Sequence, residues 1–128
     1  MKQIVLPLLV SLILSYPLLA QETLPAKAFN AKMKSTPDAV VLDVRTPSEV
    51  ELGTIPDAIN VDFKSPDFSS KITSLDKDKT YFVYCAKGGR SIKAVDEMKK
   101  LGFKKLVNLE EGYAGWVESG LPTTKKDE

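Results

Sequence analysis

Short apolar runs alternate with amphipathic stretches along residues 26–122. Runs of β-branched, aliphatic or aromatic residues predict strands at 39–44, 59–61, 81–84 and 105–109, of which 59–61 has the weakest pattern. The nearly continuous apolar run 39–44 indicates a strand buried on both faces. Stretches bounded by Pro, Gly or charged turns predict helices, at 26–35, 47–52, 65–75, 91–101 and 112–119. Residues 21–25 have neither pattern and are expected to form a loose chain end. The alternation of strands and helices predicts an α/β fold with a mainly parallel sheet.

Two of the predicted helices carry clear local signals. The helix after residue 46 has a capping Thr46, a proline at its first position and Glu49 three residues after the cap, and Gly53 ends it. The helix 91–101 is amphipathic and is followed by Gly102. Its predicted apolar face consists of Ile92, Val95, Met98 and Leu101.

The first 20 residues resemble an export signal. Lys2 precedes an uncharged apolar stretch, residues 4–20, which ends in the small residue Ala20. We therefore predict a signal peptide at 1–20, a single domain at 21–128, and an exported protein, periplasmic or extracellular, with no membrane contact after leader cleavage. The alternative is an uncleaved anchor, which Pro7 and Pro17 disfavour because they interrupt the apolar stretch.

The composition excludes several classes of function. The formal net charge is +1, which does not favour binding to nucleic acid. The chain has no histidine, so Ser-His-Asp and Cys-His catalysis are excluded, and its one cysteine rules out a thiolate metal cage and an internal disulfide. We expect no metal, no cofactor and a monomeric protein.

The single cysteine, Cys85, follows the predicted strand 81–84. This position lies at the carboxyl edge of a parallel sheet, where ligands bind. The glycines that follow allow backbone N–H groups to point inward, and the next helix begins with a partial positive charge. Lys87 and Arg90 add two cations. All of these features favour a reactive thiolate, and the alternative is a buried, inert core cysteine.

The loop resembles the active-site loop of the rhodanese-like sulfurtransferases, which is Cys-x-x-Gly-x-Arg followed by Ser or Ala. Here the loop reads Cys85, Ala86, Lys87, Gly88, Gly89, Arg90, Ser91. Three further segments resemble the family's motifs, and with the loop they span about residues 26–122 in the family's order. They are Leu42-Asp43-Val44-Arg45 with Glu49, Gly53 to Asn60, and Leu109 to Trp116.

The chain departs from the family's motifs at three positions. Thr54 stands where the family often has His, and Asp57 stands where Gly is usual. Glu111 replaces the first of two glycines before Tyr113. These departures lie outside the Cys85 loop, so we expect them to alter the rim of the site rather than its chemistry.

The resemblance implies a rhodanese-like fold, a mainly parallel five-stranded sheet with helices on both faces. It also implies that catalytic Cys85 takes a sulfane sulfur from a small anionic donor such as thiosulfate, and passes the sulfur from a persulfide to a thiol or cyanide. The loop residues would bind the substrate; these are Ala86, Lys87, Gly88, Gly89, Arg90 and Ser91. Asp43 and Arg45 would support the site, either as substrate contacts or as an ion pair that positions the neighbouring loops.

Two alternative functions remain open. A rhodanese-fold module can bind a partner or sense redox state without catalysis. Phosphatases and arsenate reductases also place a cysteine and an arginine on an anion-binding loop, but their signature has five residues between the two. Cys85 and Arg90 have four residues between them. We expect this shorter loop to suit a single sulfur atom better than a tetrahedral phosphate.

Overall fold

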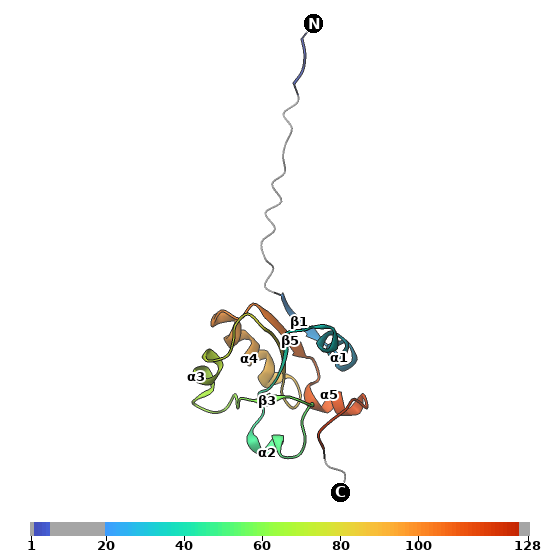
Figure 1. The fold of residues 1–128 in the computed structure, drawn as a ribbon, viewed down its shortest axis with the longest axis vertical. Coiled ribbons are helices and arrows are strands. Elements are labelled where there is room, and N and C mark those ends of the chain that lie inside the picture. Colours follow the sequence, from blue (N-terminus) through green and yellow to red (C-terminus); the bar gives the residue numbers. More distant parts are fainter. Residues whose placement is uncertain (1, 6–19, 126–128) are drawn as a thin grey trace.

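Five parallel strands form the centre of the domain (Figure 1). The structure is a computed structural model that describes residues 2–5 and 20–125. The strands lie in the order β1-β5-β4-β2-β3. Their bounds are β1 (Ala20–Leu24), β2 (Ala39–Asp43), β3 (Ile59–Asn60), β4 (Thr80–Tyr84) and β5 (Lys105–Leu109). This arrangement confirms the predicted α/β fold with a five-stranded parallel sheet.

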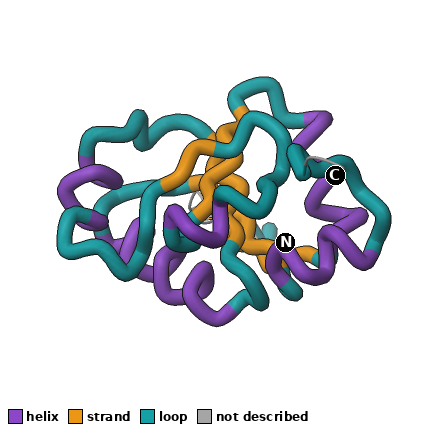
Figure 2. Tube along the Cα trace, turned by 90° about the horizontal axis from the view of Figure 1, so that it is seen from below, coloured by secondary structure: helices purple, strands orange, loops and turns teal. Residues whose placement is uncertain are grey.

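Helices cover both faces of the sheet, as Figure 2 shows from below. Their bounds are α1 (Ala26–Ser35), α2 (Pro47–Val50), α3 (Phe68–Thr73), α4 (Gly89–Lys100) and α5 (Gly112–Glu118). Tyr81 and Val83 of β4 pack in a core with α3 and α4, whereas Phe82 packs on the other face with α1 and α5. All five residues of β4 are buried, because each face of this central strand is covered.

The expectation of a loose chain end at 21–25 is wrong. Residues Ala20–Leu24 form β1, an edge strand that pairs in parallel with β5, with Gln21 opposite Leu106 and Thr23 opposite Asn108. The segment is polar and is paired on one side only, so it has no hydrophobic pattern. Its strand conformation comes from hydrogen bonding to the free edge of β5.

Apart from α1, the helices differ from their predicted bounds by one to three residues at one or both ends. Helix α4 begins at Gly89 rather than residue 91, and α3 begins at Phe68. The predicted core role of Ile92 is wrong, because its side chain is 54% exposed while Val95 is buried. Ile92 lies in the first turn of α4, next to the loop.

The predicted cap of α2 is present. The Thr46 amide donates to the Glu49 carboxylate at 3.2 Å, and Gly53 follows with a φ of +126°. The predicted leader falls largely on residues 6–19, which lie outside the described residues, so the signal peptide stays a prediction. Within residues 2–5 and 20–125, no helix has the length and apolar character needed to cross a bilayer.

Asp57 lies in the turn that leads into β3, and its substitution tests whether this turn stores backbone strain. It is the one non-glycine at positive φ among the described residues, with φ at +64°. This conformation costs a side chain about 1–2 kcal/mol, which glycine avoids at a smaller entropic cost. Asp57→Gly should raise the free energy of unfolding in urea by about 0.5–1 kcal/mol. Asp57→Ala should lower it, and equal stability of the two variants would show that the turn stores no backbone strain.

Candidate active site

Cys85 follows directly after β4, at the carboxyl edge of the sheet. Its side chain is only 1% exposed, and the loop that follows it leads into α4. Gly88 adopts a left-handed conformation, with φ at +104°, and turns the chain back over the sulfur. The thiol therefore lies below the surface, at the base of the loop.

Hydrogen bonds surround the sulfur atom in place of water. The Gly88 amide donates to Cys85 Sγ at 3.1 Å, and the Ser91 hydroxyl lies 3.4 Å from Sγ. Burial raises the pKa of the Cys85 thiol. The Ser91 hydroxyl and the backbone amides of Ser91, Gly88 and Lys87 lower this pKa by more, so that it lies below its ordinary value. The loop thus favours the thiolate, as the sequence predicted, although backbone and hydroxyl donors contribute more than cations.

Arg90 is held by a partner that the sequence analysis did not assign to it. Its guanidinium donates two hydrogen bonds to the Glu49 carboxylate, at 2.7 and 2.8 Å. The hydrogen bond from Arg90 is the main cause that lowers the pKa of Glu49 to about 2. From the sequence, Glu49 is assigned to the start of a helix and to the motif of residues 42–45, and nothing there indicates the contact with Arg90, 41 positions away. Lys87, in contrast, is exposed and forms no ion pair with any described residue.

Close backbone contacts hold the loop in place. A Cβ at Gly88 would lie 2.4 Å from the Glu110 carbonyl oxygen, and a Cβ at Gly112 would lie 2.6 Å from the backbone of Ala86. The Tyr113 amide donates to the Cys85 carbonyl at 2.8 Å. The end of β5 and the start of α5 therefore fix the backbone of the loop, and both glycines are required by this close approach.

Asp43 and Arg45 form a buried ion pair. Their exposed fractions are 0% and 3%, and Arg45 Nη2 lies 2.8 Å from Asp43 Oδ2. The Tyr84 hydroxyl donates to the same carboxylate oxygen at 2.6 Å, and Arg45 donates to the Gly53 carbonyl at 2.7 Å. The Arg45 guanidinium also stacks over the Tyr113 ring, 4.3 Å from its centroid. The pair thus ties β2, β4 and α5 together beside the Cys85 loop.

The three departures from the family's motifs lie at the rim or beyond it. Thr54 exchanges backbone and hydroxyl hydrogen bonds with Thr124, which holds the C-terminal segment in place. Asp57 lies in the turn described above. Glu111 caps α5, and its side chain fills the space beside Gly115. Within the described part of the chain, none of the three forms a hydrogen bond with the Cys85 side chain.

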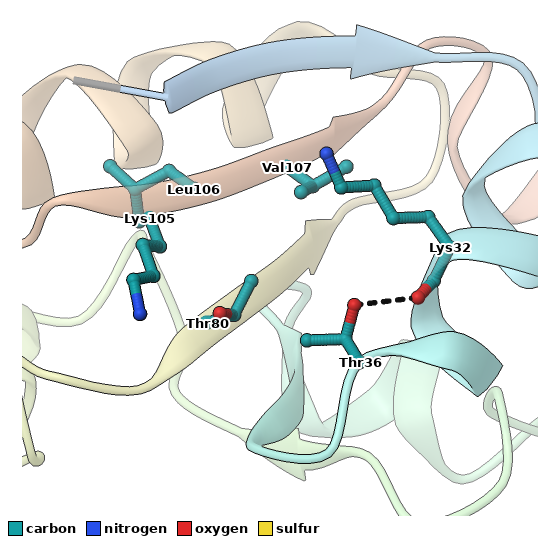
Figure 3. Close-up of a pocket in the computed structure, with 6 residues that line it drawn as sticks. All are labelled: Lys32, Thr36, Thr80, Lys105, Leu106 and Val107. Atoms are coloured by element: carbon teal, nitrogen blue, oxygen red, sulfur yellow. Dashed lines mark hydrogen bonds between the residues drawn. The ribbon is translucent and has the colours of Figure 1, made fainter. Parts of the chain in front are cut away.

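A small pocket lies at the other end of the sheet (Figure 3). Its volume is about 130 Å³, and it is lined by Lys32, Thr36, Thr80, Lys105, Leu106 and Val107. Thr80 is the first residue of β4, whereas Cys85 follows the last, so about 17 Å of strand separates the two. The pocket is therefore not part of the candidate active site. In residues 2–5 and 20–125, no cluster of His, Cys, Asp or Glu is suited to hold a metal ion.

Comparisons with known proteins agree with this geometry. The family model described as "Rhodanese-like domain" matches residues 26–119. A rhodanese-related protein from Thermoplasma volcanium has a crystal structure that is similar with a TM-score of 0.72 and 33% identity, over 82% of this chain and 99% of that one.

The curated relatives include proteins named as sulfurtransferases and as tRNA hydroxylases. Thiosulfate sulfurtransferase 16 from Arabidopsis thaliana chloroplasts is 38% identical over 92 residues, which are 64% of this chain and 77% of the relative. Other relatives are also named as sulfurtransferases. A tRNA uridine(34) hydroxylase from Legionella pneumophila is 36% identical over 87 residues, which are 65% of this chain but 34% of the relative.

The hydrogen bonds to Cys85 predict its reactivity with pH. Alkylation by iodoacetamide should rise with pH through a midpoint below about 8.5, the pKa of a free cysteine. Ser91→Ala removes the hydroxyl that lies against the sulfur and lowers the pKa of Cys85, so its midpoint should move up toward that of free cysteine. Ser119→Ala, which removes a hydroxyl at the distant end of α5, should leave the profile unchanged. A wild-type midpoint at or above 8.5 would show that the loop does not activate the thiol.

Proposed function

We propose that this chain, which belongs to the rhodanese-like family, is a sulfurtransferase that carries sulfane sulfur on Cys85. The observation that supports this proposal most directly is the set of hydrogen-bond donors around the sulfur atom. Gly88 N–H lies 3.1 Å from Sγ, and the amides of Lys87 and Ser91 also favour the thiolate. Sulfur transfer needs a nucleophilic thiolate and an environment that stabilises the anionic persulfide formed from it.

The reaction divides into two displacements at sulfur. The Cys85 thiolate attacks the outer sulfur of thiosulfate, an S–S bond forms, and the original S–S bond breaks with its electron pair leaving on sulfite. The product on the enzyme is a persulfide anion. A thiolate or cyanide then attacks the terminal sulfur, takes it, and releases the Cys85 thiolate. The cyanide product is thiocyanate, and neither step needs a proton transfer or a histidine base.

The donor is proposed to be a small sulfur-containing anion. The exposed ammonium of Lys87 is not paired with any described carboxylate, so it is free to attract an anion to the mouth of the site. Thiosulfate is an example of such a donor, and one relative is named for it. The acceptor is proposed to be a thiol or, in the assay, cyanide.

A non-catalytic binding or redox-sensing module is the second candidate. The burial of Cys85, which is 1% exposed, is the observation that favours it. A purely structural cysteine, however, does not need its pKa lowered by four hydrogen-bond donors, and that lowering favours catalysis. The spacing of Cys85 and Arg90 continues to disfavour the phosphatase alternative.

Cys85 should form a persulfide. Incubation with thiosulfate should add the mass of one sulfur atom to the intact protein, and cyanide should remove it with release of thiocyanate. Cys85→Ser should abolish both steps, because a hydroxyl near neutral pH is a far weaker sulfur nucleophile. Lys87→Ala should still form the persulfide, with a KM for thiosulfate raised about two- to fivefold by the loss of one exposed charge. Transfer that survives in Cys85→Ser would contradict the proposal.

We also propose that the protein acts outside the cytoplasm, as the leader-like residues 1–20 suggest. Protein isolated from its native host should begin at or near Gln21 when its N-terminus is determined by mass spectrometry. Ala20→Leu should block or shift the cleavage, because a small residue is needed before the cut. Recovery of the full-length wild-type chain in the membrane fraction would instead support an uncleaved anchor.

A further inference from the structure

Glu49 and Arg90 join two elements at the mouth of the site. Glu49 lies in α2, and its carboxylate also accepts hydrogen bonds from the amide and hydroxyl of Thr46, at 3.2 and 3.0 Å. Arg90 is the second residue of α4, five positions after Cys85. The guanidinium and the carboxylate meet in a two-pronged contact at 2.7 and 2.8 Å. Because the Thr46 cap fixes Glu49, the position of Arg90 is fixed as well.

The charges of Glu49 and Arg90 offset each other within this contact. Glu49, Cys85 and Asp62 each lie close enough to Arg90 to favour its positive charge. The side chain of Glu49 is 30% exposed and that of Arg90 is 22% exposed, and the pair therefore borders the solvent. An incoming donor meets an Arg90 whose charge is already neutralised. The free positive charge of the loop is that of Lys87.

We propose that Glu49 determines how strongly the site selects sulfur donors by their charge, because it holds Arg90 and cancels its charge beside Cys85. This inference rests on the proposed sulfur transfer. The site then gains little from a second negative charge on the donor. It accepts a monoanionic donor, such as an organic thiosulfonate or persulfide. Dianionic thiosulfate has only a small advantage over such a donor.

Two donors of matched chemistry separate the effect of charge. With thiosulfate, the Cys85 thiolate takes the outer sulfur and releases the dianion sulfite. With methanethiosulfonate, the same thiolate takes the outer sulfur and releases the monoanion methanesulfinate. Both reactions form one S–S bond, break one S–S bond and leave the same persulfide anion on Cys85, so the donors differ mainly in charge.

The test compares Glu49→Gln with Glu51→Gln. Glutamine keeps an oxygen that accepts hydrogen bonds from Thr46 and Arg90, but it removes the negative charge. Glu51 lies at the end of the same helix, is exposed, and forms no ion pair with the described residues, so its variant controls for net charge. The ratio of kcat/KM for thiosulfate to that for methanethiosulfonate should rise about tenfold in Glu49→Gln. The rise should come mainly through KM, and Glu51→Gln should keep the wild-type ratio.

A second measurement does not depend on sulfur transfer. Iodoacetate and iodoacetamide are similar in size but differ by one negative charge, so the ratio of their rates with Cys85 reports the charge at the mouth. This ratio should rise about three- to tenfold in Glu49→Gln and stay constant in Glu51→Gln. If Glu49 served only to cap α2, both reagents and both donors would change by the same factor, and neither ratio would move.

The outcomes separate this inference from the proposed function. If the wild type transfers sulfur from neither donor, the proposed function fails. The ratio of the iodoacetate and iodoacetamide rates then still decides whether Glu49 neutralises Arg90. A constant or reduced ratio in Glu49→Gln, in either measurement, overturns the inference. A reduced ratio would mean that Glu49 aims Arg90 at the anion instead of cancelling its charge.

Discussion

A thiolate that is almost completely buried needs hydrogen bonds in place of water, and this requirement shapes the site around Cys85. The donors are mainly backbone amides of the loop that follows β4, and they point at the sulfur only in one loop conformation. Gly88 provides the left-handed turn that this conformation requires. The Ser91 hydroxyl, in the first turn of α4, also lies against the sulfur, at 3.4 Å. The thiol chemistry of this chain therefore depends on backbone geometry more than on any single side chain.

The rest of the domain holds that backbone geometry in place. The start of α5 packs against the loop so closely that Gly112 has no room for a side chain. On the other side, the buried pair of Asp43 and Arg45 is bonded to Tyr84 of β4, the residue before Cys85. Removing one partner of such a pair leaves a buried charge without compensation, which is strongly destabilising. These residues support the site from beneath and need not contact the substrate.

Charge at the mouth has a separate origin from the reactivity of the thiol. Hydrogen bonds within the loop account for most of the lowering of the Cys85 pKa, whereas the two cations of the loop face outward or toward Glu49. This separation lets the charge at the entrance be altered while the hydrogen bonds to the nucleophile stay in place. Glu49 and Lys87 are therefore the positions at which donor preference can change with the least effect on chemistry.

The sequence by itself determined the α/β fold, four of the five strands, the helix cap at Thr46 and the loop that carries Cys85. These features have local patterns, since apolar runs, capping residues and glycines act on their own segment. Tertiary structure decided β1, because a polar segment becomes a strand only when β5 offers it a free edge. It also decided the pairing of Glu49 with Arg90, because the two residues are 41 positions apart in the chain and only the fold brings their side chains together. Long-range contacts of this kind are made by the fold, and no local pattern records them.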